Sequence, residues 1–169
     1  MPYPICFVSL GPGEPELITL KGLKKLQQAD VIYCPATLDK SGQSLSRAAN
    51  IVKELNIEDS TIQLFTLPMS KDRTEAWKAY DRLYEKAVSA RLEGKKTVIV
   101  AEGDAGFYSS IQYIYDKFKA NNIEVERTAG IPAFIAAGAL AGLHIVKQEE
   151  QIIVIPGILT AEELSEKIK

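Results

Sequence analysis

The chain has 169 residues, of which 46% are hydrophobic and 25% are charged, and its formal net charge is −2. This composition is typical of a folded protein with a sizeable core, and it excludes disordered, collagen-like and coiled-coil chains. Twenty basic residues against 22 acidic ones leave no basic excess for binding a phosphate backbone. A nucleic-acid partner is therefore not expected.

The sequence also argues against a membrane or metal-binding protein. Its most apolar stretch, residues 129–143, is too short to span a bilayer, is rich in Ala and Gly, and contains Pro132. The first four residues, MPYP, lack the charged start of a secretion signal, so we expect a cytoplasmic protein with no membrane partner. The two cysteines are far apart and His144 is the single histidine, a pattern that predicts no metal site.

Short β-branched runs alternate with helical patterns along the chain, which predicts an α/β fold with a parallel sheet and crossover helices. The expected strands cover residues 5–10, 31–34, 61–67, 97–101, 124–128 and 152–155, with Pro35 closing the second. The expected helices cover about residues 17–26, 45–55, 74–93 and 108–121, a segment after Pro132, and a last one that begins at Ala161. The uninterrupted apolar run Thr97–Ala101 is typical of a central strand buried on both faces.

Ligands of open parallel sheets bind at the carboxyl ends of the strands, which directs attention to the loops 11–16, 102–110 and 130–133. The loop 102–110 brings two carboxylates, an aromatic pair and two hydroxyls to the end of the most buried predicted strand. We therefore interpret it as part of a binding site for a ligand with amino, hydroxyl and planar parts. Solvated turn residues are the alternative.

The first loop resembles a dinucleotide-binding fingerprint, but only weakly. Gly11-Pro12-Gly13 follows a strand and precedes a helix, whereas Glu16 stands where the third glycine is required. Glu14 and Glu16 would lie beside a pyrophosphate, and two like charges about 4 Å apart repel by about 4 kcal/mol at an effective dielectric of 20. An anionic cofactor is therefore disfavoured, and a sharp turn without a ligand remains the other interpretation.

Three segments in chain order resemble the signature loops of the tetrapyrrole methylase family: LGPGEPELITLK at 10–21, EGD at 102–104 and AGIPAF at 129–134. Within that family, Tyr33-Cys34-Pro35, the stretch 68–73 followed by Trp77, and FYSS at 107–110 resemble the precorrin-2 C20-methyltransferases of cobalamin synthesis. The resemblance runs over the whole chain.

The resemblance implies two α/β domains that enclose S-adenosylmethionine between them, and usually a homodimer. We expect the first domain over residues 1–121 and the beginning of an incomplete second domain over residues 122–169. The positions expected to contact the cofactor are Pro12, Glu102, Gly103, Asp104, Phe107, Pro132 and Ala133. The positions expected to meet the substrate are Gly11 and Gly13 beneath the macrocycle, the cations Arg47, Lys71 and Arg73, and Tyr108, Ser109 and Ser110.

The implied reaction transfers the sulfonium methyl to C20 of precorrin-2 or cobalt-factor II. That carbon is already nucleophilic, and orientation alone can supply about 7 to 11 kcal/mol, so no catalytic residue is assigned. Ala105 departs from the family pattern, which has proline there, and predicts a less rigid loop.

Other functions stay open. Within the family these are methylation at another corrin carbon, of diphthine or of ribosomal RNA. Outside it, the chain would be a non-catalytic domain that a partner completes over the apolar stretch 152–159, or a dinucleotide-binding module.

Overall fold

The computed structural model describes residues 2–39, 41–68, 73–155, 157 and 159–168. The strands are β1 (Ile5–Ser9), β2 (Val31–Leu38), β3 (Ser44–Leu45), β4 (Ile62–Thr66), β5 (Thr97–Ala101) and β6 (Val125–Thr128). The α-helices are α1 (Leu20–Gln27), α2 (Arg47–Glu54), α3 (Thr74–Leu92), α4 (Gln112–Ala120), α5 (Ala133–Leu140) and α6 (Ala161–Lys167). Two short 3-10 helices, η1 (Pro15–Leu17) and η2 (Asp59–Thr61), lie in the connections.

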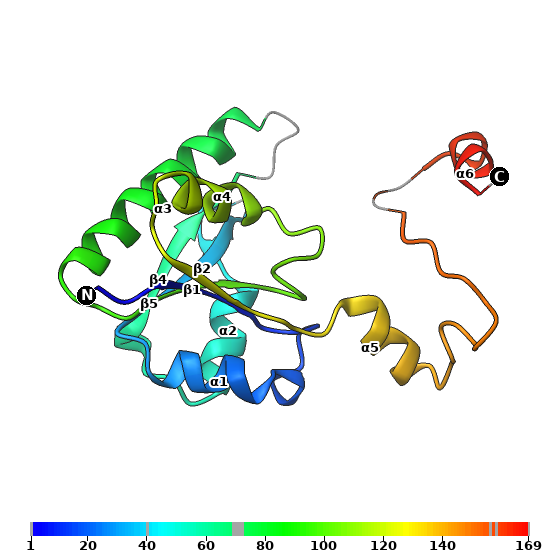
Figure 1. Ribbon diagram of the computed structural model, residues 1–169, viewed down its shortest axis with the longest axis horizontal. Helices are drawn as coiled ribbons and strands as arrows, with labels where there is room; N and C mark the ends of the chain where they lie inside the picture. The colour runs from blue at the N-terminus through cyan, green and yellow to red at the C-terminus, as the bar shows by residue number, and fades with distance from the viewer. Residues whose placement is uncertain (1, 40, 69–72, 156, 158, 169) are drawn as a thin grey trace.

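The sheet confirms the predicted α/β class (Figure 1). Five parallel strands lie in the order β4-β2-β5-β1-β6, and the short β3 pairs antiparallel with the end of β2. Val8 of β1 is in register with Val100 of β5 on one side and Thr128 of β6 on the other. The carboxyl ends of β1, β5 and β6 therefore meet at one edge of the sheet.

Helices cover both faces of this sheet because the side chains of each strand alternate between them. On one face, Phe7 and Ile99 pack among side chains of α3 and α4. On the other, Val8 and Val100 pack among side chains of α1 and α2. The side chains of β1 and β5 are buried on both faces of the sheet, which explains why these strands are apolar along their length.

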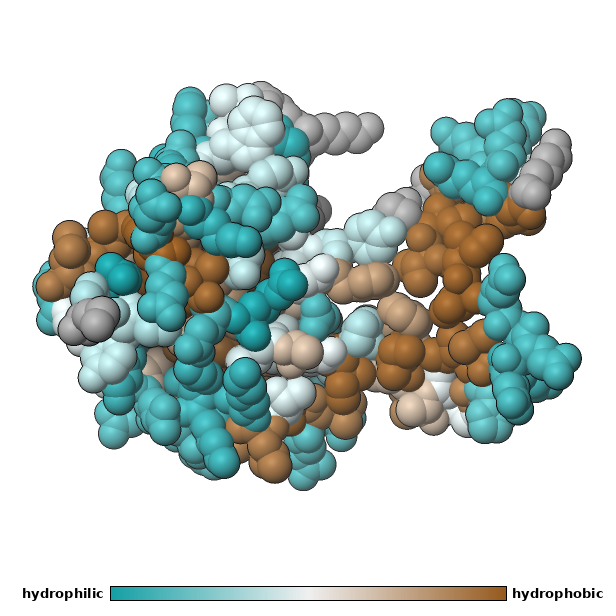
Figure 2. Space-filling view, viewed as in Figure 1, coloured by the Kyte–Doolittle hydropathy of each residue, from teal (hydrophilic) through white to brown (hydrophobic). Residues whose placement is uncertain are grey.

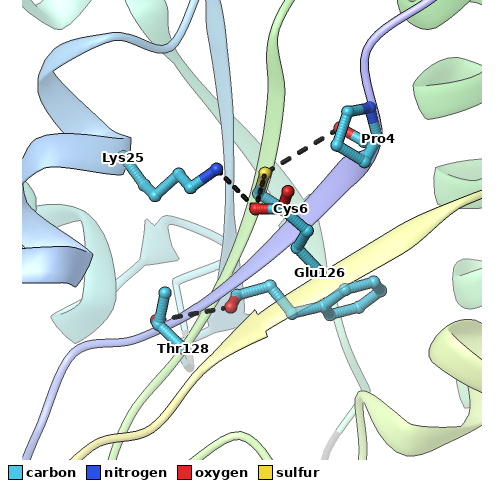
Figure 3. A network of polar contacts seen from close by, with 6 residues as sticks. Pro4, Cys6, Lys25, Glu126 and Thr128 are labelled. Atoms are coloured by element: carbon cyan, nitrogen blue, oxygen red, sulfur yellow. Dashed lines mark hydrogen bonds and ion pairs between the residues drawn. The ribbon is translucent and has the colours of Figure 1, made fainter.

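An ion pair fastens helix α1 to the edge strand β6 at the amino end of the sheet (Figure 3). Lys25 donates a hydrogen bond to Glu126, and the Cys6 thiol lies 3.8 Å from the same carboxylate. The bond raises the pKa of Lys25 and lowers the pKa of Glu126, while burial raises the pKa of Cys6. Cys6 is therefore a protonated, inert thiol in this network.

Two strand predictions were wrong. Strand β2 continues through Pro35 to Leu38, because its pairing with β5 stops at Tyr33 and Pro35 has only β4 beside it. An edge of this kind tolerates a residue without an N–H group. Ile152–Ile155 forms no strand in the described part of the chain, and Ile153 is 64% exposed. A strand needs a neighbouring strand to pair with its backbone groups, and this segment has no such strand among the described residues; its Val154 carbonyl accepts a hydrogen bond from the Tyr108 hydroxyl at 3.4 Å.

Strand β6 belongs to the sheet, since its residues pair with β1 from Ile5↔Val125 to Val8↔Thr128. A division between residues 121 and 122 would separate β6 from this unit, so the packed α/β unit runs through Thr128. After β6 the chain leads away from the sheet through α5 to α6 (Figure 1).

Helix α5 and the segment after it expose much apolar surface (Figure 2). Leu140 is 92% exposed. The other large exposed apolar residues there are Ile135, Leu143, Ile145, Val146, Ile152, Ile153 and Val154. None of the helices in the described ranges has the length and apolar character needed to cross a membrane.

Candidate active site

The loops that follow β1 and β5 are joined directly at the carboxyl edge of the sheet. Gly11 and Gly103 donate backbone hydrogen bonds to each other's carbonyls, at 3.1 and 2.7 Å. Both residues have positive φ, 79° and 68°, a conformation that only glycine adopts without cost. The backbones of these two loops therefore lie in direct contact.

A buried serine ties the loop after β5 to the end of β6. The Ser9 hydroxyl donates to the Thr128 carbonyl at 2.6 Å and accepts from the Ala105 N–H at 2.8 Å. Ser9 has no exposed surface, and Thr128 is only 2% exposed. One hydroxyl thus connects β1, the turn after β5 and the last residue of β6.

The Asp104 carboxylate also connects the loop after β5 to the loop after β6. One carboxylate oxygen accepts the Gly106 N–H and the other accepts the Gly130 N–H, both at 2.7 Å. Gly130 lies so close to its neighbours that an added Cβ would be 2.5 Å from the Gly103 carbonyl oxygen. The three predicted loops consequently form one connected surface.

An open cavity of about 460 Å³ lies over these loops, a size in the range of small-molecule sites. The residues that line it are Pro12, Arg47, Glu102, Gly103, Asp104, Phe107, Tyr108, Pro132, Ala133 and Phe134. All seven positions predicted for the cofactor are among them. Phe134 was not among the predicted positions, although it is the last residue of the motif at 129–134 and its ring lies 5.7 Å from that of Phe107.

Glu102 is the partly free carboxylate of this cavity. It is exposed over 43% of its side chain and lies 3.7 Å from Nε of Arg47, which also donates to the Pro12 carbonyl at 3.4 Å. An ion pair this exposed contributes little to stability, so the Glu102 carboxylate stays accessible from the cavity. The cavity therefore presents negative charge, aromatic rings and backbone groups together.

A second cavity, of about 700 Å³, shares Phe107 and Tyr108 with the first. Its lining residues are Arg73, Gly106, Phe107, Tyr108, Ser109, Ser110, Gln112 and Tyr113. It thus holds four of the positions predicted for the substrate. Tyr108 stands between the two cavities with a strained φ of 49°, a conformation found preferentially at functional sites.

The wall of this second cavity is supported from helix α3. The hydroxyls of the buried Tyr80 and of Ser110 lie 2.6 Å apart, and the Tyr80 ring packs near that of Tyr113 at 6.2 Å. Burial raises the pKa of Tyr80, so its hydroxyl stays protonated. The sequence pattern could have indicated Tyr113, which follows Ser109 and Ser110 by one helical turn, whereas only the fold brings Tyr80 to them.

Arg47, predicted for the substrate, lines the first cavity, whereas Gly11 and Gly13 line neither of the two. Gly11 is buried, with the Leu17 carbonyl 3.1 Å from where a Cβ would be, and the Arg47 guanidinium fills the space beside Gly13. Neither glycine lines a floor beneath a macrocycle in these two cavities. Lys71 lies outside the described residues.

The three joined loops are the segments that carry the family resemblance. The family model of the Tetrapyrrole (Corrin/Porphyrin) Methylases matches residues 4–168. The chain belongs to this family. Among tetrapyrrole methylases, a precorrin-2 C(20)-methyltransferase of a Sinorhizobium species is 33% identical to this chain, over 95% of this chain and 67% of that protein.

Other members of the family are similar as well. A probable cobalt-precorrin-2 C(20)-methyltransferase of Methanocaldococcus jannaschii is 30% identical over 88% of this chain and 62% of its own length. A cobalt-precorrin-4 C(11)-methyltransferase of Priestia megaterium is also 30% identical, over 79% of this chain and 45% of that protein. The crystal structure of a cobalt precorrin-4 methyltransferase shares the fold, with a TM-score of 0.61 at 24% identity, over 86% of this chain and 53% of that one. The chain spans about two thirds of the length of its C(20) relatives.

Proposed function

We propose that this chain binds S-adenosylmethionine in the 460 Å³ cavity and forms part of a methyltransferase that acts on C20 of precorrin-2 or cobalt-factor II. The observation that carries the proposal is the convergence of three separate loops, and of all seven expected cofactor positions, on one cavity. The C20 assignment is supported by two relatives named for that position.

The cavity suits a cation with planar and apolar parts. A sulfonium carries positive charge, which the half-exposed Glu102 carboxylate stabilises, whereas a pyrophosphate would be repelled there. The rings of Phe107 and Phe134 offer flat apolar walls for a nucleobase. The dinucleotide-binding alternative fits these residues less well.

When bound, S-adenosylmethionine would supply the methyl group that C20 receives, and C20 would lose a proton. What the chain must supply is alignment of the two reactants, worth about 7 to 11 kcal/mol when the geometry is productive. The shared wall of Phe107 and Tyr108 places the two cavities side by side. Arg73 in the second cavity and Arg47 at the rim of the first are the described cations that would meet substrate carboxylates.

Calorimetric titration with S-adenosylhomocysteine tests the proposed cofactor site without an unstable substrate. We expect one-to-one binding at micromolar affinity, and Glu102→Gln should weaken it about tenfold because a charge-assisted contact is lost. Glu124→Gln is the matched control, since Glu124 is exposed at the opposite end of β6. A well-folded chain that binds no S-adenosylhomocysteine would refute the proposal for this chain.

Methylation at C11 is the second candidate, because a C(11) relative is as similar as one of the C(20) relatives. Parallel incubations of labelled methyl donor with precorrin-2 or cobalt-factor II and with cobalt-precorrin-4, followed by NMR of the products, distinguish the two. Label at C20 supports the first assignment, and label at any other carbon overturns it. Sedimentation of the same sample tests the homodimer that the family resemblance implies.

A further inference from the structure

Asp104 lies in the proposed cofactor cavity, yet both of its carboxylate oxygens already have backbone partners. The Gly106 N–H takes one oxygen and the Gly130 N–H takes the other. The first bond closes the turn after β5, and the second reaches across to the loop after β6. The carboxylate thus spans the gap between two loops that come from different strands.

The packing beneath Asp104 leaves these loops little freedom. The backbone of Gly130 rests on Ser9 and on the Gly103 carbonyl, with no room for a side chain. Ser9 also bridges Ala105 to the end of β6. The Asp104 carboxylate adds its hydrogen bond to Gly130 to this packing, so both packing and hydrogen bonds hold the two loops together.

We propose that Asp104 is a positioning residue that holds the loop after β6 against the loop after β5. It thereby sets the distance across the cavity between Pro132 and Phe107. This inference rests on the proposed function, but it assigns Asp104 a different role from Glu102. Glu102 is the carboxylate left to face a cationic ligand, and Asp104 acts through the backbone.

Hydrogen exchange of backbone amides separates a clamp from a direct ligand contact, and it requires no ligand. In the unliganded chain we expect a protected Gly130 amide, and in Asp104→Asn an amide that exchanges about tenfold faster or more, because one acceptor oxygen is lost. Glu102→Gln, a carboxylate change in the same loop, should leave Gly130 protected. The proposal is overturned if Gly130 exchanges at the unprotected rate in the wild-type chain, or if Asp104→Asn leaves its exchange unchanged.

Binding of S-adenosylhomocysteine then tests the consequence for the cavity. Asp104→Asn should weaken binding about tenfold. Gly130→Ala, which keeps the carboxylate but forces the loops apart, should weaken it by a similar factor. The double variant should bind within about twofold of the weaker single variant, because both changes break one clamp.

The alternative outcomes are distinct. Full additivity in the double variant, or Gly130→Ala with unchanged affinity, would overturn the positioning role. Should Asp104→Asn fail to fold, the wild-type exchange rate and Gly130→Ala decide the question alone. If the wild-type chain binds no S-adenosylhomocysteine while its Gly130 amide is protected and responds to Asp104→Asn, the clamp stands and the proposed function fails.

Discussion

Replacing Ser9 with alanine is expected to destabilise the chain more than any exposed serine change, because its hydroxyl is the buried junction of three segments. The hydroxyl donates to the Thr128 carbonyl and accepts from the Ala105 N–H, at 2.6 and 2.8 Å. Each buried group left without a partner costs about 1 to 3 kcal/mol. With two such groups, we expect the free energy of unfolding to fall by about 2 to 6 kcal/mol, the lower end applying if water reaches the freed carbonyl.

Urea denaturation followed by circular dichroism measures this change, with the midpoint and the slope fitted separately. Ser89→Ala is the matched control, since Ser89 is exposed on α3 and its hydroxyl reaches only the exposed Glu93 side chain; it should change stability by less than about 0.5 kcal/mol. A loss below about 1 kcal/mol for Ser9→Ala, at an unchanged slope, would refute the reasoning. It would mean that the Thr128 carbonyl and the Ala105 N–H are not left without partners when the hydroxyl is removed.

Three further predictions concern other parts of the chain. The carboxylate of Glu126 has a pKa lowered from 4.5 by Lys25, so its stabilisation is present above that value and is lost as pH falls through the lowered one. The raised pKa of Lys25 means that its share is present below 10.5 and is lost as pH rises through the raised value. Glu126→Gln should flatten the acid side of a plot of the free energy of unfolding, measured with urea, against pH. The difference should stay under about 1 kcal/mol because both side chains are partly exposed, and an unchanged slope would contradict this. Burial raises the pKa of Cys34 to about 12, so iodoacetamide at about pH 8 should modify it only after denaturation, and labelling of the native chain, read by peptide mass, would show the thiol to be accessible. Tyr80→Phe removes the hydroxyl pair with Ser110 and should cost about 1 kcal/mol in urea unfolding, whereas a neutral change would mean that water replaces it fully.

The convergence of the three loops could be predicted from the sequence because it follows from local patterns and one topological rule, whereas the individual positions expected to contact a cofactor came from the family resemblance. Apolar β-branched runs identify strands such as Thr97–Ala101, and parallel strands bring the residues after them to one edge. Glu102 and Pro132 are far apart in the chain, yet each follows a strand of this sheet closely. Their meeting at one cavity needed no knowledge of side-chain packing.

Other features depended on neighbours that a local pattern does not describe. Ile152–Ile155 is an apolar β-branched run like that of a strand, but it pairs with no strand among the described residues; its Val154 carbonyl accepts a hydrogen bond from the Tyr108 hydroxyl. Trp77 is spaced like a core residue relative to Tyr80 on α3, yet it is 50% exposed, and its ring lies 6.4 Å from that of Tyr113 on α4. In both cases the local pattern was real and the tertiary environment decided the outcome.

The sequence by itself determined the fold class, the order of strands and helices along the chain, and the loops that carry the site, because these follow from the period of hydrophobic residues and from glycines at sharp turns. The tertiary structure alone decided that β6 completes the sheet, that Tyr80 supports Ser110, and that the Asp104 carboxylate is taken by Gly106 and Gly130. These contacts join segments distant in sequence or depend on the exact path of a loop. Their energies arise from burial and hydrogen-bond geometry, which exist only once the chain has folded.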